Sequence, residues 1–206
     1  MSRLEDPTIK IHPDIESFRR RAAFQVSMPD KSGKSFAWIC LIQGDFSADA
    51  PVLPFEFTNL ADTVGRYADE LEKLAKKHGK VDVGPLKAAQ QTLMKSAQAY
   101  EQAYQQSAAS GVIFQRDAAQ LHTLNKMLYL SERVLMSPEG LPRRPWFKHH
   151  LYAPGFYTGY GIKTIPFVRE ALEQQQWDEA ARGVQVVQRQ LIALAYHIDS
   201  TTQLAK

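Results

Sequence analysis

The chain has 206 residues, 44% of them hydrophobic, and a formal net charge of +3 at pH 7. That length is enough for one sizeable core and short for two. The 25 basic and 22 acidic residues are interspersed, a pattern that gives little support for a nucleic-acid partner. No apolar run reaches the roughly 20 residues of a membrane span, and the N-terminus lacks the apolar core of a signal peptide.

The first 49 residues carry the least regular pattern, and we treat them as a segment distinct from a helical domain over residues 50–206. Helical spacing of apolar residues predicts a short helix over Asp14–Val26. Phe36–Ile42 is an apolar run of strand length that could equally be a buried helical turn. Cys40, the single cysteine, lies in this run, so we expect a buried thiol rather than a nucleophile.

Two helices are predicted after residue 50. Asn59 with Asp62 three residues later indicates the start of the first helix, and Gly79 its end. Pro85 is a good first-turn residue for the second helix, which Ser110 and Gly111 terminate. One apolar stripe along the first helix predicts its buried face: Leu60, Val64, Tyr67, Leu71 and Leu74.

Three further helices complete the domain. The third is predicted from about Gln115 to Met136, and a short one follows, capped by Thr164 with Pro166 in its first turn. The last runs from about Asp178 to Ala205 and alternates apolar residues by four and three: Ala180, Val184, Val187, Leu191, Leu194 and Ile198. Such a seam suits packing at a shallow crossing angle. The sequence therefore predicts an all-α, four-helix-bundle-like domain.

Leu141–Pro166 is a crossover loop rich in proline, glycine and aromatic residues, in which no helix or strand of ordinary length is expected. Its aromatic content predicts an ordered loop that packs on the helices at both sides. Arg143, Arg144 and Lys148 could hold a carboxylate, although ion pairing within the loop is the favoured reading. We expect six residues to anchor the loop: Arg144, Pro145, Trp146, His149, Tyr152 and Pro154.

No catalytic or metal-binding set is predicted within the chain. Among the six histidines there is no HExxH pattern, and adjacent His149 and His150 would point to opposite sides of an extended chain. One cysteine excludes an internal disulfide and a multi-cysteine metal site. The glycines of the loop (Gly155, Gly159 and Gly161) lack the strand–loop–helix context of a nucleotide site, so we expect them to permit tight turns.

Two long runs are similar to motifs of a known family. GLPRRPWFKHHLYAPGFYTGYGIKTIPFVREAL, residues 140–172, and APVLPFEFTNLADTVGRYADEL, residues 50–71, resemble parts of one helical domain. That domain belongs to the glutamate carboxypeptidase II-like zinc peptidases and is shared with the transferrin receptor. The resemblance covers roughly Ala48 to the C-terminus, with both motifs in the right order and spacing.

The resemblance implies that the chemistry resides elsewhere. In the family, zinc, its ligands and a glutamate base belong to a preceding α/β domain that this chain does not encode, so neither a cofactor nor catalysis is expected of the chain alone. A Lys-Tyr pair of the family's loop contacts the substrate's terminal glutamate. Alignment on Tyr152-Ala153-Pro154 places Gly159 and Tyr160 at that pair, and the glycine replaces the lysine. A preference for C-terminal glutamate is therefore not expected.

The resemblance also implies a homodimer, because the equivalent domain associates in the family, which is often extracytoplasmic. The last helix carries apolar residues off its seam, among them Ile192 and Tyr196, which are our candidates for the contact between two copies. Packing beneath the crossover loop is the other explanation of these residues. Two alternative functions stay open: a fragment of an active zinc peptidase that needs a catalytic peptidase domain as partner, and an unrelated helical adaptor that binds other proteins.

Overall fold

The structure is a computed structural model in which residues 51–77, 80–159 and 161–206 are described. The helix predicted over Asp14–Val26, the run Phe36–Ile42 with Cys40, and the helix stop at Gly79 lie outside these residues. The separation of residues 1–49 from the helical domain stays a prediction for the same reason.

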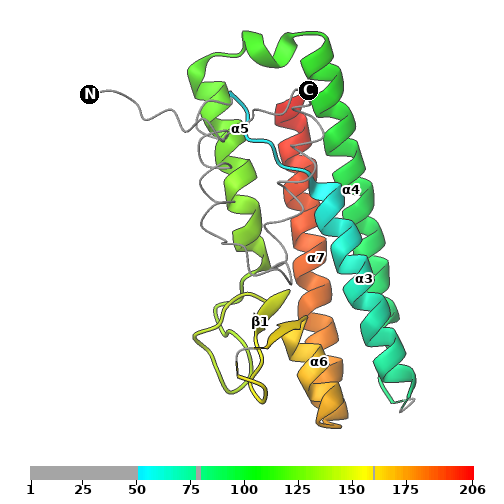
Figure 1. Ribbon diagram of the computed structural model, residues 1–206. Coiled ribbons are helices and arrows are strands. Elements are labelled where there is room, and N and C mark those ends of the chain that lie inside the picture. The colour runs from blue at the N-terminus through cyan, green and yellow to red at the C-terminus, as the bar shows by residue number, and fades with distance from the viewer. Residues whose placement is uncertain (1–50, 78–79, 160) are drawn as a thin grey trace, which may run out of the picture. The chain divides into compact units, whose positions relative to one another are not determined.

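The described part of the chain is all-α apart from two strands of three residues each, as the sequence predicts. Its helices are α3 (Phe57–Lys76), α4 (Gly84–Ala109), α5 (Ala118–Leu130), α6 (Pro166–Glu173) and α7 (Trp177–Ala205), with 3₁₀ turns η1 (Val112–Gln115) and η2 (Ser131–Leu135). Helix α7 packs against α4, α5, α6 and η2. Figure 1 shows α4 and α7 side by side and running in the same direction, with α3 and α5 running the opposite way.

Helix α7 carries the centre of the core. All six residues of its predicted seam are buried, and the helix begins and ends within a residue of the predicted bounds. The seam meets the buried face of α4, where Leu86, Leu93 and Ala97 are inaccessible to solvent. Burial of a leucine or valine side chain contributes about 1.5–3 kcal/mol, so this seam contributes substantially to the domain's stability.

The predicted start of α3 at Asn59 is wrong. The helix begins at Phe57, and no side chain of the preceding residue caps it. Its first turn is capped from another helix instead: Glu101 of α4 accepts hydrogen bonds from the backbone N–H of Thr58 at 3.0 Å and from its hydroxyl at 2.7 Å. Phe57 packs edge-to-face on Tyr100 with ring centroids 5.2 Å apart. Tertiary contacts with α4 therefore set where α3 begins.

The third predicted helix, Gln115 to Met136, is in fact two pieces, α5 and η2, and the short helix η1 ends where it was expected to begin. Asp117 caps α5 by accepting from the Gln120 N–H at 2.8 Å, while the Gln120 side chain accepts from the Asp117 N–H at 3.2 Å. This capping box fixes the start of α5 after residue 117. The final turn narrows to the 3₁₀ helix η2 before the chain becomes extended at Met136.

The predicted capping of α6 by Thr164 is also wrong, although Pro166 lies in its first turn as expected. The residue before the helix is Ile165, in the left-handed region at φ 45°. The carbonyl and hydroxyl oxygens of Thr164 accept hydrogen bonds from the Arg169 guanidinium at 3.0 and 2.7 Å, so its side chain is engaged elsewhere. A β-branched residue in this region is strained, and burial of Ile165 holds it there.

Candidate functional site

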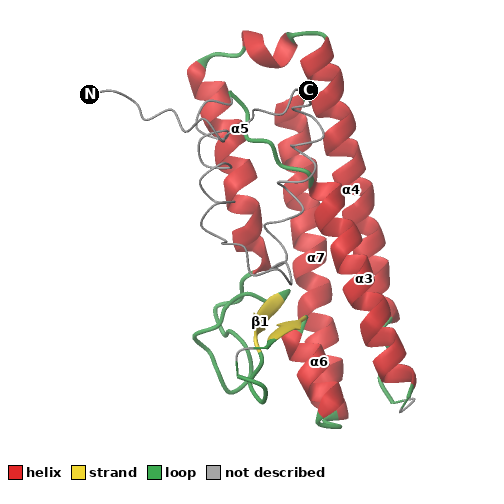
Figure 2. Cartoon of the chain, in the orientation of Figure 1, coloured by secondary structure: helices red, strands yellow, loops and turns green. Residues whose placement is uncertain are grey.

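The crossover loop is an ordered structure that joins η2 to α6. Strand β1 (Tyr152–Pro154) pairs antiparallel with β2 (Ile162–Thr164), with Tyr152 opposite Thr164. The Gly155 N–H donates to the Gly161 carbonyl at 2.7 Å and closes the turn between the strands. Figure 2 shows this hairpin as the only strand structure drawn, beside the start of α6. A loop dense in proline and glycine is thus held in one shape.

A buried ion pair fastens the hairpin to α6. The guanidinium of Arg144 lies 2.7 Å from the carboxylate of Glu170, and these residues are 2% and 5% exposed. Arg144 also donates to the carbonyl of Pro154. The second carboxylate oxygen of Glu170 accepts from the Phe156 N–H at 2.8 Å. One charge pair therefore holds the C-terminal end of β1, at Pro154, and the start of the turn, at Phe156.

Aromatic rings complete the surroundings of the Arg144 guanidinium. The rings of Phe147 and Phe156 lie 5.7 and 5.9 Å from its central carbon, within the range of cation–π attraction. Arg144 is therefore enclosed where the loop meets α6, and its carboxylate partner belongs to α6 rather than to the loop. Arg143 likewise pairs outside the loop, with both oxygens of Glu179 on α7 at 2.7 and 3.1 Å.

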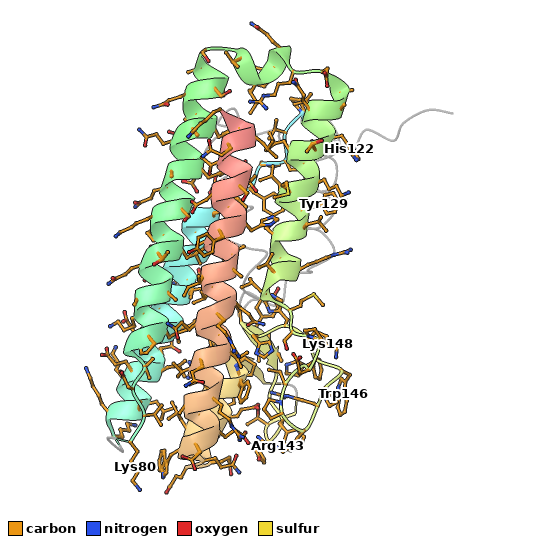
Figure 3. The ribbon with its side chains drawn as sticks, turned by 180° about the vertical axis from the view of Figure 1, so that it is seen from behind. Lys80, His122, Tyr129, Arg143, Trp146 and Lys148 are labelled. Atoms are coloured by element: carbon orange, nitrogen blue, oxygen red, sulfur yellow. The ribbon has the colours of Figure 1, made fainter. Side chains whose placement is uncertain are left out.

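Trp146 is not an anchor, so that expectation is wrong. Its side chain is 68% exposed, and Figure 3 shows it at the outer edge of the loop. The reason is the tight turn Leu141–Arg144, which directs Leu141 and Arg144 inward and leaves Pro145 and Trp146 exposed. Gly140 permits that turn, since a Cβ there would lie 2.3 Å from the carbonyl oxygen of Pro145.

Three residues that sequence reasoning missed hold the loop: Glu170, Leu141 and Leu151. Both leucines are 2% exposed, and Leu151 belongs to the main core. Each stands alone in a polar or aromatic stretch, so no periodic pattern marks it. Glu170 looks like an ordinary surface residue of an amphipathic helix, and only its long-range partner Arg144 explains its burial.

His149 and Tyr152 face a glutamate of η2. Their rings lie 4.3 Å apart, and the Tyr152 hydroxyl donates to the Glu132 carboxylate at 2.6 Å. His149 Nδ1 accepts from the Leu151 N–H at 3.2 Å. Burial lowers the pKa of His149, against a smaller opposing effect of Glu132. Burial raises the pKa of Tyr152, and its hydrogen bond with Glu132 adds to the increase.

His150 points the other way, toward Phe167 of α6, whose ring centroid lies 6.1 Å from its own. It is 1% exposed, and neither ring nitrogen has a hydrogen-bond partner within the described residues. Burial lowers its pKa to about 4, with His149 adding to the decrease. The adjacent histidines thus contact different neighbours, His149 the ring of Tyr152 and His150 the ring of Phe167.

Of the two residues aligned with the family's substrate pocket, the structure describes only Gly159. Gly159 is exposed at the tip of the hairpin, with φ at 64°, and Tyr160 lies outside the described residues. Nothing within 4 Å would meet a Cβ at Gly159. The expected pocket function of this pair therefore stays a prediction.

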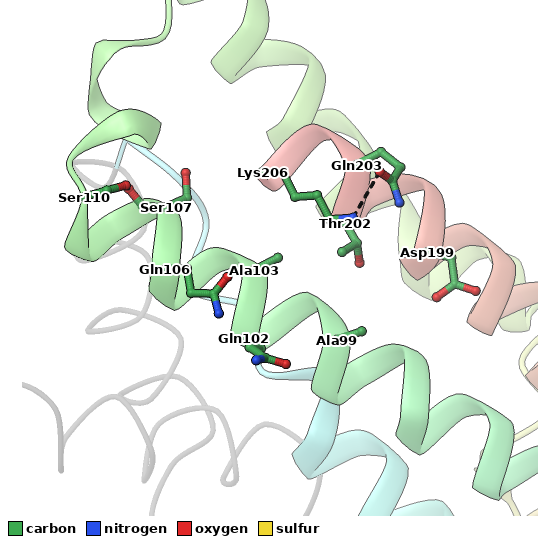
Figure 4. Close-up of a pocket in the computed structure, with 10 residues that line it drawn as sticks. All are labelled: Ala99, Gln102, Ala103, Gln106, Ser107, Ser110, Asp199, Thr202, Gln203 and Lys206. Carbon is green, nitrogen blue, oxygen red and sulfur yellow. Dashed lines mark hydrogen bonds between the residues drawn. The ribbon is translucent and has the colours of Figure 1, made fainter.

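The outer face of α7 carries the candidates for contact between two copies. Tyr196 is 70% exposed, and Ile192, one turn earlier, is half-buried against the core. Asp199 and Gln203 continue this face and line a groove between α7 and α4, opposite Gln102 and Gln106 (Figure 4). The crossover loop does not cover Tyr196, so packing beneath that loop does not account for this residue.

Within residues 51–77, 80–159 and 161–206, three or more histidine, cysteine or acidic side chains do not come together as a metal site would require. In the same residues, every helix is too short or too polar to cross a membrane. The groove between α4 and α7 is lined mainly by amides and hydroxyls.

Fold and loop together define a helical bundle domain whose last helix forms the core on one side and exposes aromatic surface on the other. Residues 81–199 match the transferrin receptor-like dimerisation domain, and the chain belongs to that family. The predicted resemblance is confirmed. Membership removes the alternative of an unrelated helical adaptor.

The proteins of similar sequence reported below are all named as probable glutamate carboxypeptidases. The chain is 31% identical over 148 residues to a probable glutamate carboxypeptidase of Arabidopsis thaliana called LAMP1, with 70% of this chain and 20% of that protein covered. The probable glutamate carboxypeptidase AMP1 of the same plant is 31% identical over 163 residues, covering 73% and 23%. A probable glutamate carboxypeptidase of Arthroderma benhamiae is 28% identical over 193 residues, covering 89% and 24%. The chain spans about a quarter or less of the length of these relatives.

Proposed function

We propose that the chain is the self-association domain of a glutamate carboxypeptidase-like protein, that it forms a homodimer, and that it carries no catalysis of its own. Its membership in a dimerisation-domain family supports self-association. The contact lies on the outer face of α7, where Tyr196 is the most exposed large hydrophobic residue of the described chain.

The distribution of apolar residues around α7 supports a dimer contact on its outer face. One apolar stripe is enough for a helix to face a core, and the seam from Ala180 to Ile198 already supplies it. Tyr196 adds a large ring on the opposite side, and tyrosine is enriched at protein interfaces because it combines apolar area with a polar tip. A two-fold contact would place this face of one copy against the same face of the other.

Light scattering behind a sizing column tests the homodimer. We expect twice the chain mass of 23.3 kDa and an interface of at least ~1,000 Å² in total. Tyr196→Glu should yield monomers, because it introduces a charge into the contact, while helicity by circular dichroism is unchanged. Trp146→Glu is the matched control, since that aromatic residue is similarly exposed but lies on the loop.

Two outcomes contradict the proposal in different ways. A monomer at every concentration over a hundredfold range excludes self-association. A dimer that Trp146→Glu disrupts and Tyr196→Glu does not places the contact at the loop instead.

The second candidate function is a part of an active zinc peptidase, in which residues 152–166 line the substrate pocket. The names of the relatives and the small share of their length that this chain spans favour it. The chain alone should retain no zinc after dialysis against a weak chelator and should hydrolyse no glutamate-terminated peptide. One retained equivalent of zinc, with activity that strong chelation abolishes, would show a complete catalytic site in this chain.

A further inference from the structure

The side chain of His150 makes no hydrogen bond within the described residues that would explain why a histidine is buried in the crossover loop. His150 is 1% exposed and leaves both ring nitrogens without a partner within the described residues, and His149 Nε2 is likewise buried without one. Buried polar atoms are normally hydrogen-bonded, because an unpaired one costs free energy. A leucine or phenylalanine would fill the site of His150 without that cost. The property that distinguishes the imidazole from those side chains is that it can bind a proton.

The segment that carries the two rings joins the loop to its surroundings on both sides. The His150 N–H donates to the Leu135 carbonyl of η2 at 3.2 Å, and the Ser137 N–H donates to the Lys148 carbonyl at 2.9 Å. Toward α6, the Ile165 N–H donates to the Leu151 carbonyl at 2.7 Å. Displacement of residues 148–151 would break all three hydrogen bonds and leave the contacts of Arg144 and Glu170 as links between the hairpin and α6.

Protonation of His149 conflicts with the closed loop. Its Nδ1 accepts from the Leu151 N–H at 3.2 Å, so this nitrogen carries no proton there. In the neutral ring the proton therefore lies on Nε2, 3.8 Å from the Glu132 carboxylate. A second proton would have to bind Nδ1, where it would face the backbone N–H and end that hydrogen bond.

Protonation of His150 conflicts with its burial. The ring faces Phe167 of α6, which offers an aromatic surface and no acceptor. The acidic groups that act on the two rings are Glu132 of η2, which already accepts from the Tyr152 hydroxyl, and Glu139 just before the loop, which accepts from the Ser137 hydroxyl. A charged imidazole at His150 would therefore be buried without a direct partner, which proteins avoid.

We propose that His149 and His150 make closure of the crossover loop acid-sensitive: the loop stays closed while both rings are neutral, and proton uptake opens residues 135–165 while the bundle remains folded. The proposal is independent of self-association. The loop lies beside α6 and the first half of α7, whereas Ile192 and Tyr196 lie in its second half (Figure 1).

The direction of the effect follows from linkage. The pKa of His150 is lowered by burial from 6.5 to about 4 in the closed loop, so the open loop binds the proton more tightly. Opening is therefore little affected above pH 6.5 and becomes more favourable as the pH falls below that value. For His150 alone, the equilibrium constant for opening should rise roughly 30-fold between pH 7.5 and pH 5.

Hydrogen–deuterium exchange of the full chain at pH 7.5 and pH 5 tests the proposal, after correction for the intrinsic pH dependence of exchange. Peptides that contain the N–H groups of His150, Leu151 and Ile165 should show the excess opening, and peptides from α4 and α7 should not. His150→Leu should abolish most of it. His122→Leu is the matched control, since His122 is an exposed histidine on α5 (Figure 3).

Equal protection of the loop at both pH values in the unmodified chain would overturn the proposal. So would excess opening that His150→Leu leaves intact. If that variant does not fold, NMR titration of the histidine ring protons in the unmodified chain decides. A His150 ring that titrates near 6.5 while the loop N–H groups stay protected is incompatible with the proposal. Light scattering of the same samples reports the oligomeric state separately.

Discussion

The seam between α7 and α4 and the crossover loop are both well ordered, but they are held together by different physics. The seam is a continuous row of apolar side chains, each contributing a modest amount through burial. The loop depends on a few buried polar groups, chiefly the pair Arg144–Glu170, with Leu141 and Leu151 beneath it. A distributed arrangement tolerates the loss of one member better than a concentrated one. The two regions should therefore respond differently to single substitutions.

The largest effect is expected at the ion pair. Glu170→Gln leaves the Arg144 charge buried without its partner, which should weaken closure of the loop by about 3–5 kcal/mol. The loss should appear as faster proteolysis and hydrogen exchange across residues 141–165, with a smaller change in the thermal midpoint of the bundle. The double variant Arg144→Met with Glu170→Leu is the control, because replacement of both charges removes the unpaired one. A midpoint lowered as much in the double variant as in Glu170→Gln would count against this interpretation.

A somewhat smaller but global effect is expected in the seam. Leu194→Ala removes a fully buried side chain from α7, and such truncations cost about 2–5 kcal/mol. Chemical denaturation should show an unchanged slope and a lower midpoint, with all helices lost together. Gln185→Ala on the exposed side of the same helix should change little. Selective loss of the loop in Leu194→Ala would contradict the division between the two regions.

The smallest effect is expected at Trp146, the exposed aromatic of the loop. Because its side chain is 68% exposed, Trp146→Ala should change the free energy of unfolding by no more than about 0.5 kcal/mol. A buried anchor would instead cost about 3–5 kcal/mol. Thermal unfolding of the variant beside Leu141→Ala, a truncation at a buried position of the same turn, separates the two cases. A large loss at Trp146 would indicate that another part of the chain or a second copy covers it.

The seam could be predicted from the sequence because its information is local and repeated. Six apolar residues at spacings of four and three define one face of α7, and no single residue decides the pattern. Proline and glycine likewise marked the ends of α4 and the start of α6. The two family motifs also predicted the resemblance, which the match of the dimerisation-domain family to residues 81–199 confirms.

The loop anchors could not be predicted in the same way, because their partners are distant in sequence. Arg144 and Glu170 are 26 positions apart, and nothing near either residue indicates that it is buried. Trp146 was predicted to be buried because large hydrophobic side chains are buried on average. The turn at Gly140 directs this residue outward instead. Helix starts were misjudged where a tertiary contact competes with local capping, as Glu101 does at α3.

That contact at α3 has a consequence for how the domain folds. Helix α5 carries its own capping box, so its first turn can form from local interactions alone. Helix α3 receives its cap from Glu101, 43 positions further along the chain. The Thr58 N–H therefore lacks this cap until α4 has formed and docked, and loop closure must precede it. We expect α4 to serve as the template on which α3 becomes ordered, and a peptide of residues 51–77 alone to be largely unstructured in water.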